Sequence, residues 1–356
     1  MGRVSVDEKL DPARFAELAE VGAPAAPRGP EGVQWRAAAE SDIDGMHAVA
    51  VAADRVDHPS WTTPREDIAD TFDLPHIDHS RDTILALDSE GTIIAFGSSF
   101  LHPAREGELT AHLGGAVHPD HRRRGIGTAT LAWQVARAQQ QLAEVAPELA
   151  PGPWKASMKV HAEETNLDQQ HIAERVGFAA ERWFATMRRD VATAGVPAEV
   201  EVPAGYTVVP FTLDREDDAR LARNDSFRDH WGSLPSSPEG WHKFVTGAVF
   251  RPDLSRLVLD DTGAVAAFCL VSVNKEDWAT LGTPHAYIDL VGVVRAHRRR
   301  GLAPLVISAA LAAITAADLP TALLDVDTAS PTGADALYVN LGFAPGEREV
   351  ALVRHL

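Results

Sequence analysis

The sequence predicts a mixed α/β protein, with an α+β type of sheet, built from two similar tandem domains. Its 356 residues suffice for two domains of ordinary size. One segment begins at His121 and reads HRRRGIG, and another begins at His297 and reads HRRRGLA. Each follows a valine-rich run, opens an alanine-rich helical stretch and is followed by a Gly-Phe pair. The glycines Gly125 and Gly301 are 301 − 125 = 176 residues apart, which predicts a duplicated domain.

The first domain is expected at residues 33–190, after an N-terminal arm at residues 1–32. Prolines within 21–32 prevent a short amphipathic helix at 11–20 from continuing. Ser41 or Asp42 is expected to cap the first helix, and residues 88–91 predict a hairpin turn. In chain order we expect strand 33–36, helix 43–53, strands 83–87, 92–101 and 110–117, helix 128–142, strand 156–161, helix 166–176 and strand 182–188.

A linker is expected at residues 191–205, because this stretch holds Gly195, Pro197 and Pro203 and few large apolar residues. The second domain, residues 206–356, repeats the first. Its expected elements are strand 206–211, helices within 214–250, paired strands 256–259 and 265–273, strand 285–293, helix 304–317, strand 322–326, helix 334–341 and strand 349–353. Each domain is therefore predicted to have a central, mostly antiparallel sheet.

Charge and cysteine content narrow the class of protein. There are 33 Lys and Arg against 51 Asp and Glu, a formal net charge of −18, which opposes binding to nucleic acid. Cys269 is the single cysteine, so no disulfide can form within the chain. The first residues lack the apolar core of a signal peptide, and no stretch reaches the ~18 apolar residues of a membrane span. We expect a cytoplasmic monomer or homodimer that binds neither membrane nor nucleic acid.

The repeated turn of arginine and glycine predicts a diphosphate site. A strand that ends in such a turn and continues as a helix points backbone amides and the positive end of the helix dipole at one spot. Gly125 and Gly127, or Gly301 and Ala303, leave room for a phosphate beside the backbone. The neighbouring arginines can bind its remaining oxygens.

This Arg-x-x-Gly-x-Gly/Ala pattern resembles the acyl-coenzyme A signature of the GNAT superfamily of N-acyltransferases. The two-domain layout is similar to that of the mycothiol synthase-like proteins of actinobacteria. The resemblance implies an N-acetyltransferase that uses acetyl-CoA and acetylates a primary amine of a small molecule by direct attack. We expect no metal site. The cofactor-binding residues that the resemblance implies are Val117, Arg122, Arg123, Arg124, Gly125, Ile126, Gly127 and Asn166 in the first domain, and Val293, Arg298, Arg299, Arg300, Gly301, Leu302, Ala303 and Ser330 in the second.

The resemblance also implies a tyrosine that protonates the departing thiolate, in the helix before the Gly-Phe pair. Tyr338 occupies that position in the second domain. The first domain has Ala173 there, with His171 as an alternative donor. We therefore expect the second domain to be catalytic and the first to be catalytically degenerate.

Strand 285–293 supplies the candidates for the general base. Asp289 interrupts an apolar run and shares a strand face with Tyr287 and Val293. A structural carboxylate with all its hydrogen bonds made is the alternative interpretation of Asp289. His285 is the second candidate, with His112 as the histidine of the comparable first-domain strand, and a water relay is the third.

Glycines within the strands before both turns suggest an irregular sheet. Gly114 and Gly115 in the first domain, and Gly292 in the second, predict a bulge or another irregularity in those strands. The resemblance associates such an irregularity with a splayed sheet that receives the pantetheine arm.

The acceptor is expected between the first strand and the hairpin of the second domain, because the cofactor occupies the other side of the sheet. The candidate substrate-binding residues are Asp229, His230 and Trp231, together with Tyr287. Trp231 could equally be an anchor of the hydrophobic core. A non-catalytic module that binds acyl-CoA and regulates a partner is the alternative function, and the sequence does not name the amine.

Overall fold

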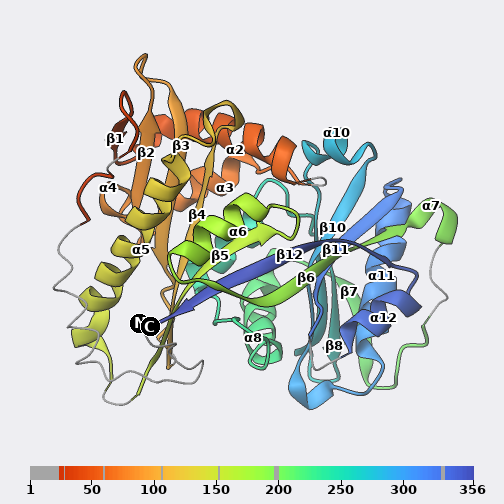
Figure 1. Ribbon diagram of the computed structural model, residues 1–356. Helices are drawn as coiled ribbons and strands as arrows, with labels where there is room; N and C mark the ends of the chain where they lie inside the picture. The colour runs from red at the N-terminus through yellow and green to blue at the C-terminus, as the bar shows by residue number, and fades with distance from the viewer. Residues whose placement is uncertain are drawn as a thin grey trace. The chain divides into compact units, whose positions relative to one another are not determined.

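A computed structural model describes residues 24–27, 29–58, 61–105, 107–150, 153–195, 200–329 and 333–356. The chain forms two compact units, drawn in Figure 1. Unit 1 comprises Met1–Arg182 and Val350–Leu356, and unit 2 comprises Trp183–Glu349. The expected helix at 11–20 lies outside the described residues. Within the described part of the chain, no helix is long and apolar enough to cross a membrane.

Unit 1 has a sheet in the order β1-β2-β3-β4-β5, and all pairs are antiparallel except β4 with β5. The expected hairpin of β2 and β3 is confirmed. The short helices α3 and α4 were not expected. The elements of unit 1 are β1 (Gln34–Arg36), α2 (Ile43–Asp57), α3 (Arg65–Ala69), α4 (His79–Asp82), β2 (Thr83–Leu87), β3 (Ile93–Leu101), β4 (Glu108–Val117), α5 (Ile126–Val145), β5 (Lys155–Glu163) and α6 (Leu167–Arg175).

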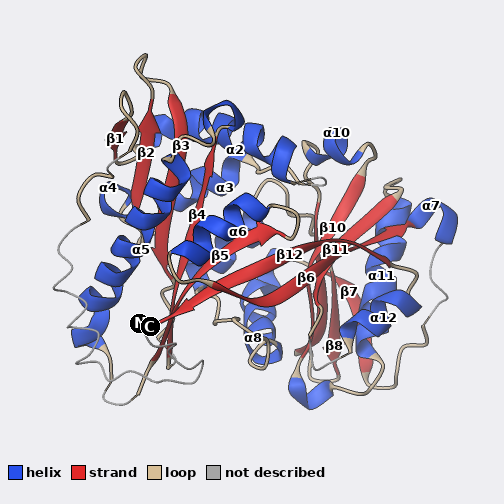
Figure 2. Ribbon diagram, viewed as in Figure 1, coloured by secondary structure: helices blue, strands red, loops and turns tan. Residues whose placement is uncertain are grey.

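Helices cover both faces of this sheet (Figure 2). Leu85 and Leu87 pack in one cluster with Met46 of α2, whereas the intervening Ala86 packs in another with Ile126 of α5. Alternate residues of a strand point to opposite faces, so α2 and α5 must lie on opposite sides. The sheet of unit 1 therefore has α2 on one face and α5 on the other.

Unit 2 repeats this plan with the strand order β6-β11-β10-β9-β8-β7, in which β10 and β11 are the parallel pair. The mixed α/β class and the mostly antiparallel sheet are thus confirmed in both units. The elements are β6 (Ala179–Asp190), α7 (Val191–Ala194), β7 (Tyr206–Pro210), α8 (Glu216–Ser226), α9 (Pro238–Thr246), β8 (Arg256–Asp260), β9 (Val265–Ser272), α10 (Asp277–Leu281), β10 (His285–Val293), α11 (Leu302–Ala316), β11 (Thr321–Asp327), α12 (Ala334–Asn340) and β12 (Ala344–His355).

The core of unit 2 also has two sides. Leu257 and Leu259 pack in a cluster with Trp241 of α9, whereas Val258 packs in a cluster with Val306 of α11. Trp241 donates its indole N–H to the carbonyl of Glu216 at 2.8 Å, so this buried polar group is satisfied. The cysteine, Cys269, is buried in the second cluster.

The compact units differ from the expected domain boundaries at two long strands. Residues 184–190 of β6 pair with β11 and belong to unit 2. Residues 350–355 of β12 belong to unit 1, where Arg354 donates to the carbonyl of Val176 at 2.9 Å. Leu356, the next residue, donates its amide to Ala156 at 3.1 Å. The apolar pattern of a strand identifies the strand but not its partner, so the sequence could not assign these segments.

Two local expectations have different outcomes: the expected helix cap is wrong, and the expected irregularity is confirmed in β10 but is not seen as a register shift in β4. Asp42 precedes α2, but its carboxylate accepts hydrogen bonds from the amide of Ala39 at 2.9 Å and from Arg36 at 2.6 and 2.7 Å, and it caps no amide of α2. The β3–β4 ladder runs through Gly114 and Gly115 without a register shift. The irregularity in β10 lies at Asp289, since the register shifts between Ile288 and Leu290 and leaves Gly292 in the regular ladder.

Gly115 nevertheless carries a backbone constraint. Its φ is +150°, and a Cβ at this position would lie 2.3 Å from the carbonyl oxygen of Phe96. At Gly114 a Cβ would make an ordinary 3.5 Å contact with Ser98. We expect Gly115→Ala to lower the free energy of unfolding by about 1–3 kcal/mol and Gly114→Ala to change it by less than about 0.5 kcal/mol, measured by urea denaturation. Equal midpoints for the two variants would contradict this explanation.

Candidate functional site

The two arginine turns have the same backbone conformation. Arg123 and Gly125 have φ of 61° and 82°, and Arg299 and Gly301 have φ of 60° and 77°. Gly125 and Gly301 stand directly before α5 and α11. Their positive φ, rather than a close contact, requires glycine, because no atom lies within 4 Å of a Cβ placed there.

The helix that follows each turn supplies free backbone donors. Ala129 and Leu305 donate to the carbonyls of Gly125 and Gly301, so the amides before them in each helix have no acceptor within the helix. Pro304 occupies the third position of α11, where Thr128 stands in α5. Unit 2 therefore offers one amide fewer to an anion than unit 1.

The first arginine of each triplet is held by protein groups. Arg122 binds both oxygens of Asp57, the last residue of α2, at 2.8 and 2.6 Å, and donates to the carbonyl of Val117 at 3.1 Å. Arg298 binds Asp229 at 3.2 Å and donates to the carbonyl of Ser226 at 2.8 Å. Each contact joins the end of a strand to the end of the helix on the far face. Arg122 and Arg298 thus position the turn.

The other arginines of the triplets are more exposed. The side chain of Arg123 is 80% exposed and pairs with the exposed Asp168 at 2.6 Å. Arg124 contacts His121 at 3.1 Å, and Arg300 donates to the hydroxyl of Tyr206 at 3.0 Å. Arg299 is exposed. Exposed surface pairs of this kind exchange partners at little cost, so these side chains can turn toward a bound phosphate.

A cavity of about 860 Å³ in unit 1 begins at this turn. Strands β4 and β5 pair only as far as His112 and Lys159 and diverge beyond them. The cavity occupies the divergence and is lined by the strand ends, the turn, α5 and α6; its lining includes Gly114, Val117, Arg122, Arg123, Gly125, Gly127, Val160, Asn166 and Arg175. Gly127 needs no special conformation, since a methyl group there would make ordinary contacts at 3.5 Å, as Ala303 implies.

Basic side chains line the inner part of this cavity. Lys159 is buried and His112 and His161 flank it in the lining. Desolvation lowers the pKa of Lys159 below its ordinary value, although Glu108 and Glu181 oppose the shift. Desolvation also lowers the pKa of His112, and the charges of Lys159 and His161 lower it further. An anionic ligand would favour the protonated form of Lys159.

A second cavity of about 300 Å³ adjoins the first within unit 1. It lies on the side of α2 and α3 and is lined by polar groups that include Asp54, Thr63, Asp67, Thr71 and His79. The residues that line both cavities are Asp54, His58, Phe96, Gly114, Gly115 and Ala116. The last residues of β4 therefore border a larger basic cavity and a smaller polar one, and the end of α2 borders both as well.

The residue pairs at the corresponding position of unit 2 are different. Strands β10 and β11 pair as far as Tyr287 and Leu323. The hydroxyl of Tyr287 donates to Asp325 at 2.5 Å, and Thr186 donates to the same carboxylate at 2.7 Å. Desolvation and the charge of Asp325 raise the pKa of Tyr287 well above its ordinary value. Tyr287 is thus bound to a carboxylate, and this part of unit 2 is acidic where unit 1 is basic.

Asp289 and Tyr338 also lie in unit 2. Asp289 is the extra residue of the bulge in β10 and accepts a hydrogen bond from Ser272 at 3.0 Å. Tyr338 is 8% exposed and its ring packs edge to face on Phe343 in the hydrophobic core, with ring centroids 5.9 Å apart. Desolvation raises the pKa of Tyr338 above its ordinary value, and a negative charge at Cys269 would raise it further.

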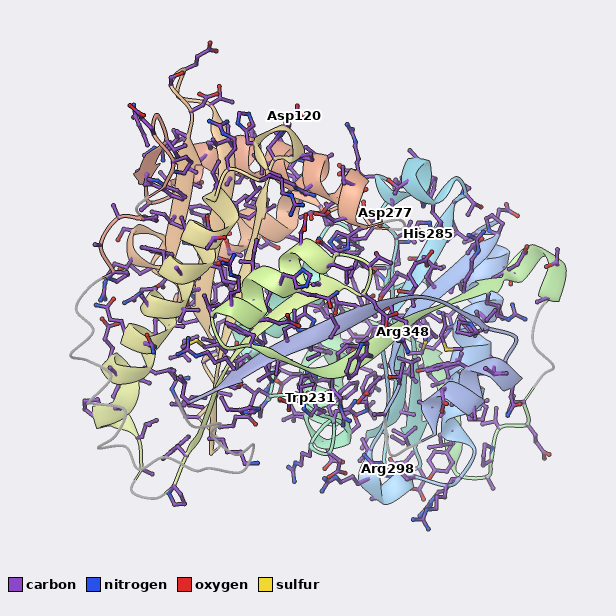
Figure 3. The ribbon with its side chains drawn as sticks, viewed as in Figure 1. Asp120, Trp231, Asp277, His285, Arg298 and Arg348 are labelled. Atoms are coloured by element: carbon purple, nitrogen blue, oxygen red, sulfur yellow. The ribbon has the colours of Figure 1, made fainter. Side chains whose placement is uncertain are left out.

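His285 lies far from the turn. It is the first residue of β10, eight residues before Val293, which is roughly 26 Å along a strand. Figure 3 shows His285 beside Asp277, and Arg298 at the opposite end of unit 2. The ring is buried, its Nδ1 lies 3.1 Å from the carbonyl of Thr283, and desolvation lowers its pKa. The structure does not bring His285 together with Val293.

The residues expected to bind the acceptor in unit 2 contact other protein groups: one pairs with arginines of the turn and two pack against aromatic rings. Asp229 forms ion pairs with Arg295 and Arg298. The ring of His230 packs on Phe227, with centroids 4.6 Å apart, and Trp231 packs 6.2 Å from Phe184. Among the described side chains, Asp229 therefore resembles Asp57 of unit 1 in its role.

Asn166 and Ser330 are the two remaining residues expected to contact the cofactor. Asn166 lines the larger cavity and caps α6 by accepting from the amide of Gln169 at 3.2 Å. Ser330 lies outside the described residues. Among the described residues, no cluster of His, Cys, Asp or Glu is suited to hold a metal ion.

Comparison with known proteins identifies the family. The sequence model of the acetyltransferase (GNAT) family matches residues 48–178 and 217–343, which lie in the two halves of the chain. The mycothiol acetyltransferase of Frankia casuarinae is 30% identical over 259 residues, which cover 68% of this chain and 70% of that protein. The mycothiol acetyltransferase of Saccharopolyspora erythraea is 27% identical over 295 residues, 79% of this chain and 87% of that protein.

Solved structures show the same fold. A GCN5-related N-acetyltransferase from Sphaerobacter thermophilus has a TM-score of 0.64 and 21% identity, covering 92% of this chain and 96% of that chain. A tandem GNAT protein from the clavulanic acid biosynthesis pathway has a TM-score of 0.59 and 19% identity, covering 91% and 98%. The chain belongs to the GNAT acetyltransferase family. It is an acyltransferase with acetyl-CoA as its cofactor, and the predicted tandem layout is confirmed.

The different roles of neighbouring arginines can be tested. Arg122→Ala leaves the mostly buried Asp57 without its partner, so we expect it to lower the free energy of unfolding by about 1–3 kcal/mol in urea denaturation. Arg123→Ala should change stability by less than about 1 kcal/mol but weaken coenzyme A binding roughly tenfold in calorimetry. If Arg123→Ala binds coenzyme A as tightly as the wild type, its assignment to the phosphates is wrong.

Proposed function

We propose that the protein transfers the acetyl group of acetyl-CoA to the primary amine of a small molecule, and that the larger cavity of unit 1 binds the donor. The observation that carries the proposal is the continuity of this cavity, which extends from the diverging strands to the arginine turn. When bound there, acetyl-CoA would supply its acetyl group as a thioester that an amine can attack directly.

The residues of unit 1 fit this donor. The amides of Ile126, Gly127 and Thr128 open α5 at the cavity, and anions bind favourably at such a helix start. Arg123 lies beside them in the lining and is exposed enough to change partners. The cavity continues to the point where β4 and β5 part, which is where an extended arm can lie between the strands.

The smaller cavity of unit 1 suits a compact cationic amine. Its carboxylates, Asp54 and Asp67, can bind an ammonium group, and Thr63 and Thr71 can pair with hydroxyl groups of the same molecule. Its volume of about 300 Å³ limits the acceptor to a small molecule or to one end of a larger one. The names of the relatives, mycothiol acetyltransferases, support a small-molecule acceptor.

Tyr338 is the alternative proton donor if the reaction takes place in unit 2 instead of unit 1. Its raised pKa keeps the phenol protonated at neutral pH, as a donor must be. Its burial against Phe343 favours a packing role instead. The two roles are separable, because Tyr338→Phe removes the hydroxyl and keeps the ring.

Matched variants of the two turns test the donor site. A glutamate in place of Gly125 or Gly301 puts a negative charge and a strained φ at the helix start. We expect Gly125→Glu to abolish most of the calorimetric heat of coenzyme A binding and most release of free thiol from acetyl-CoA with a panel of small primary amines. Gly301→Glu should retain most of both. The reverse pattern would place the donor site in unit 2, and binding without thiol release from any amine would favour the regulatory alternative.

For Tyr338→Phe we expect kcat within about threefold of the wild type, because the transition state would not use the phenol. The free energy of unfolding should also change little, since the ring still fills the core. Thiol release and urea denaturation measure the two quantities. A fall in kcat of about 10²-fold or more would assign the proton donor to Tyr338.

A further inference from the structure

His58 occupies the place where the two cavities of unit 1 meet. It follows α2 directly, and its backbone amide donates to the backbone carbonyl of Asp54, in the last turn of the helix, at 2.7 Å. Its ring nitrogen Nδ1 lies 2.9 Å from the carboxylate of Glu163, the last residue of β5. Both partners are mostly buried, with side chains 30% and 15% exposed. The mechanism implied by the sequence makes no use of this pair.

We propose that unit 1 is itself a complete acetyl-transfer site, in which His58 moves the proton between acceptor and leaving group and Glu163 positions its ring. The inference rests on the proposed function. It departs from the expectation that the first domain is degenerate, because the missing tyrosine at Ala173 is replaced by a histidine from another element.

The position of His58 carries the argument. A group that takes a proton from the amine and gives it to sulfur must reach both the acceptor and the thioester. His58 lines the smaller cavity, proposed for the acceptor, and the larger one, proposed for the donor. Asp54 lines both cavities as well, but its carboxylate accepts the amide of Thr63 at 2.7 Å. His58 is the group at this junction whose proton can be exchanged near neutral pH.

The hydrogen bond to Glu163 fixes which nitrogen of the His58 ring can take a proton from the amine. With Nδ1–H donated to the carboxylate, Nε2 is the acceptor of the imidazole. As the nitrogen of the neutral amine forms its bond to the acetyl carbon, the bond from that carbon to sulfur breaks and its electron pair leaves with sulfur. The proton lost by the nitrogen goes to Nε2, and His58 then gives it to the sulfur. The ring returns to its neutral form and the atoms balance without a further reactant.

The surrounding charges suit this role. Desolvation lowers the pKa of His58, but the hydrogen bond and charge of Glu163 and the charges of Asp54 and Asp57 outweigh it and raise the pKa above its ordinary value. Asp57 is itself bound to Arg122 of the turn. The other titratable and charged groups that line the two cavities are Asp67, His79, His112, Arg123, Lys159, His161, Asp168, His171 and Arg175.

The counterpart in unit 2 lacks this arrangement. His230 follows Asp229 as His58 follows Asp57. Its ring packs on Phe227, and desolvation lowers its pKa even though Asp327 and Asp229 act in the opposite direction. The Asp-His pair thus occurs in both units. Its imidazole is oriented by a carboxylate in unit 1 and packs on a phenylalanine ring in unit 2.

The test uses full-length proteins that carry Arg299→Glu, which reverses the charge of the exposed turn of unit 2 and so isolates turnover in unit 1. Into this background we introduce His58→Gln, Glu163→Gln and the control His242→Gln. His242 also contacts a glutamate, Glu216, through Nδ1 at 2.9 Å, but this pair is in unit 2, and His242 is largely exposed and lines neither cavity. The measurements are thiol release with glucosamine, spermidine and L-serine as amines, calorimetry with coenzyme A, and NMR titration of the histidines.

We expect His58→Gln to lower kcat by about 100-fold or more with the Kd for coenzyme A changed less than about twofold, and His242→Gln to change neither. A neutral imidazole accepts the proton, so the rate rises as pH passes upward through the pKa of His58. Removal of the charge in Glu163→Gln lowers that pKa. Its rate profile and the NMR titration of His58 should therefore both move to lower pH, which a purely structural role of Glu163 would not cause.

Three outcomes overturn the inference. Turnover of the His58→Gln protein within about threefold of its background shows that His58 is not required, and the proposed function survives. An unchanged titration of His58 in Glu163→Gln removes the positioning role of Glu163. If the wild-type protein and the Arg299→Glu background bind coenzyme A but acetylate none of the amines, the proposed function fails together with the inference.

Discussion

In unit 1 the parallel strands β4 and β5 stay paired only as far as His112 and Lys159, and the position of the larger cavity depends on that divergence. Two parallel strands that part leave backbone groups without a ladder partner and open a space that side chains or a ligand must fill. Here the space is lined by Lys159, His112 and His161 and leads to the start of α5. A basic cleft that ends at a helix N-terminus suits an elongated anion, even in a chain of net charge −18.

The geometry at the end of this cleft is fixed by an ion pair that occurs in both units. Arg122 with Asp57, and Arg298 with Asp229, join the turn after the strand to the end of the helix on the opposite face. The arginine that follows adopts a positive φ and points outward in each case. Because one arginine holds the turn, the next is available to a ligand. In both turns, therefore, the first arginine positions the turn and the second is the one that can bind a ligand.

The two units diverge in the side chains placed on this common frame. At the end of the parallel pairing, unit 1 has His112 opposite Lys159, whereas unit 2 has Tyr287 opposite Leu323 with Asp325 bound to the phenol. Unit 2 also has a proline in place of one amide at its helix start. Both differences weaken the attraction of unit 2 for a polyanion. After a duplication, one copy can keep the basic cleft while the other changes its cleft residues and still keeps the same fold.

The sequence by itself determined the fold class, the repeat and most elements, because glycine turns and strand and helix periodicities are local signals. It also located the two turns, whose glycines are required by a positive φ. It could not determine which arginine of a triplet is free, since Asp57 is 65 residues from Arg122. It could not pair His58 with Glu163, 105 residues away, nor assign the ends of β6 and β12 to their units. Those contacts join residues distant in the chain, and only the packing of helices on the sheet brings them together.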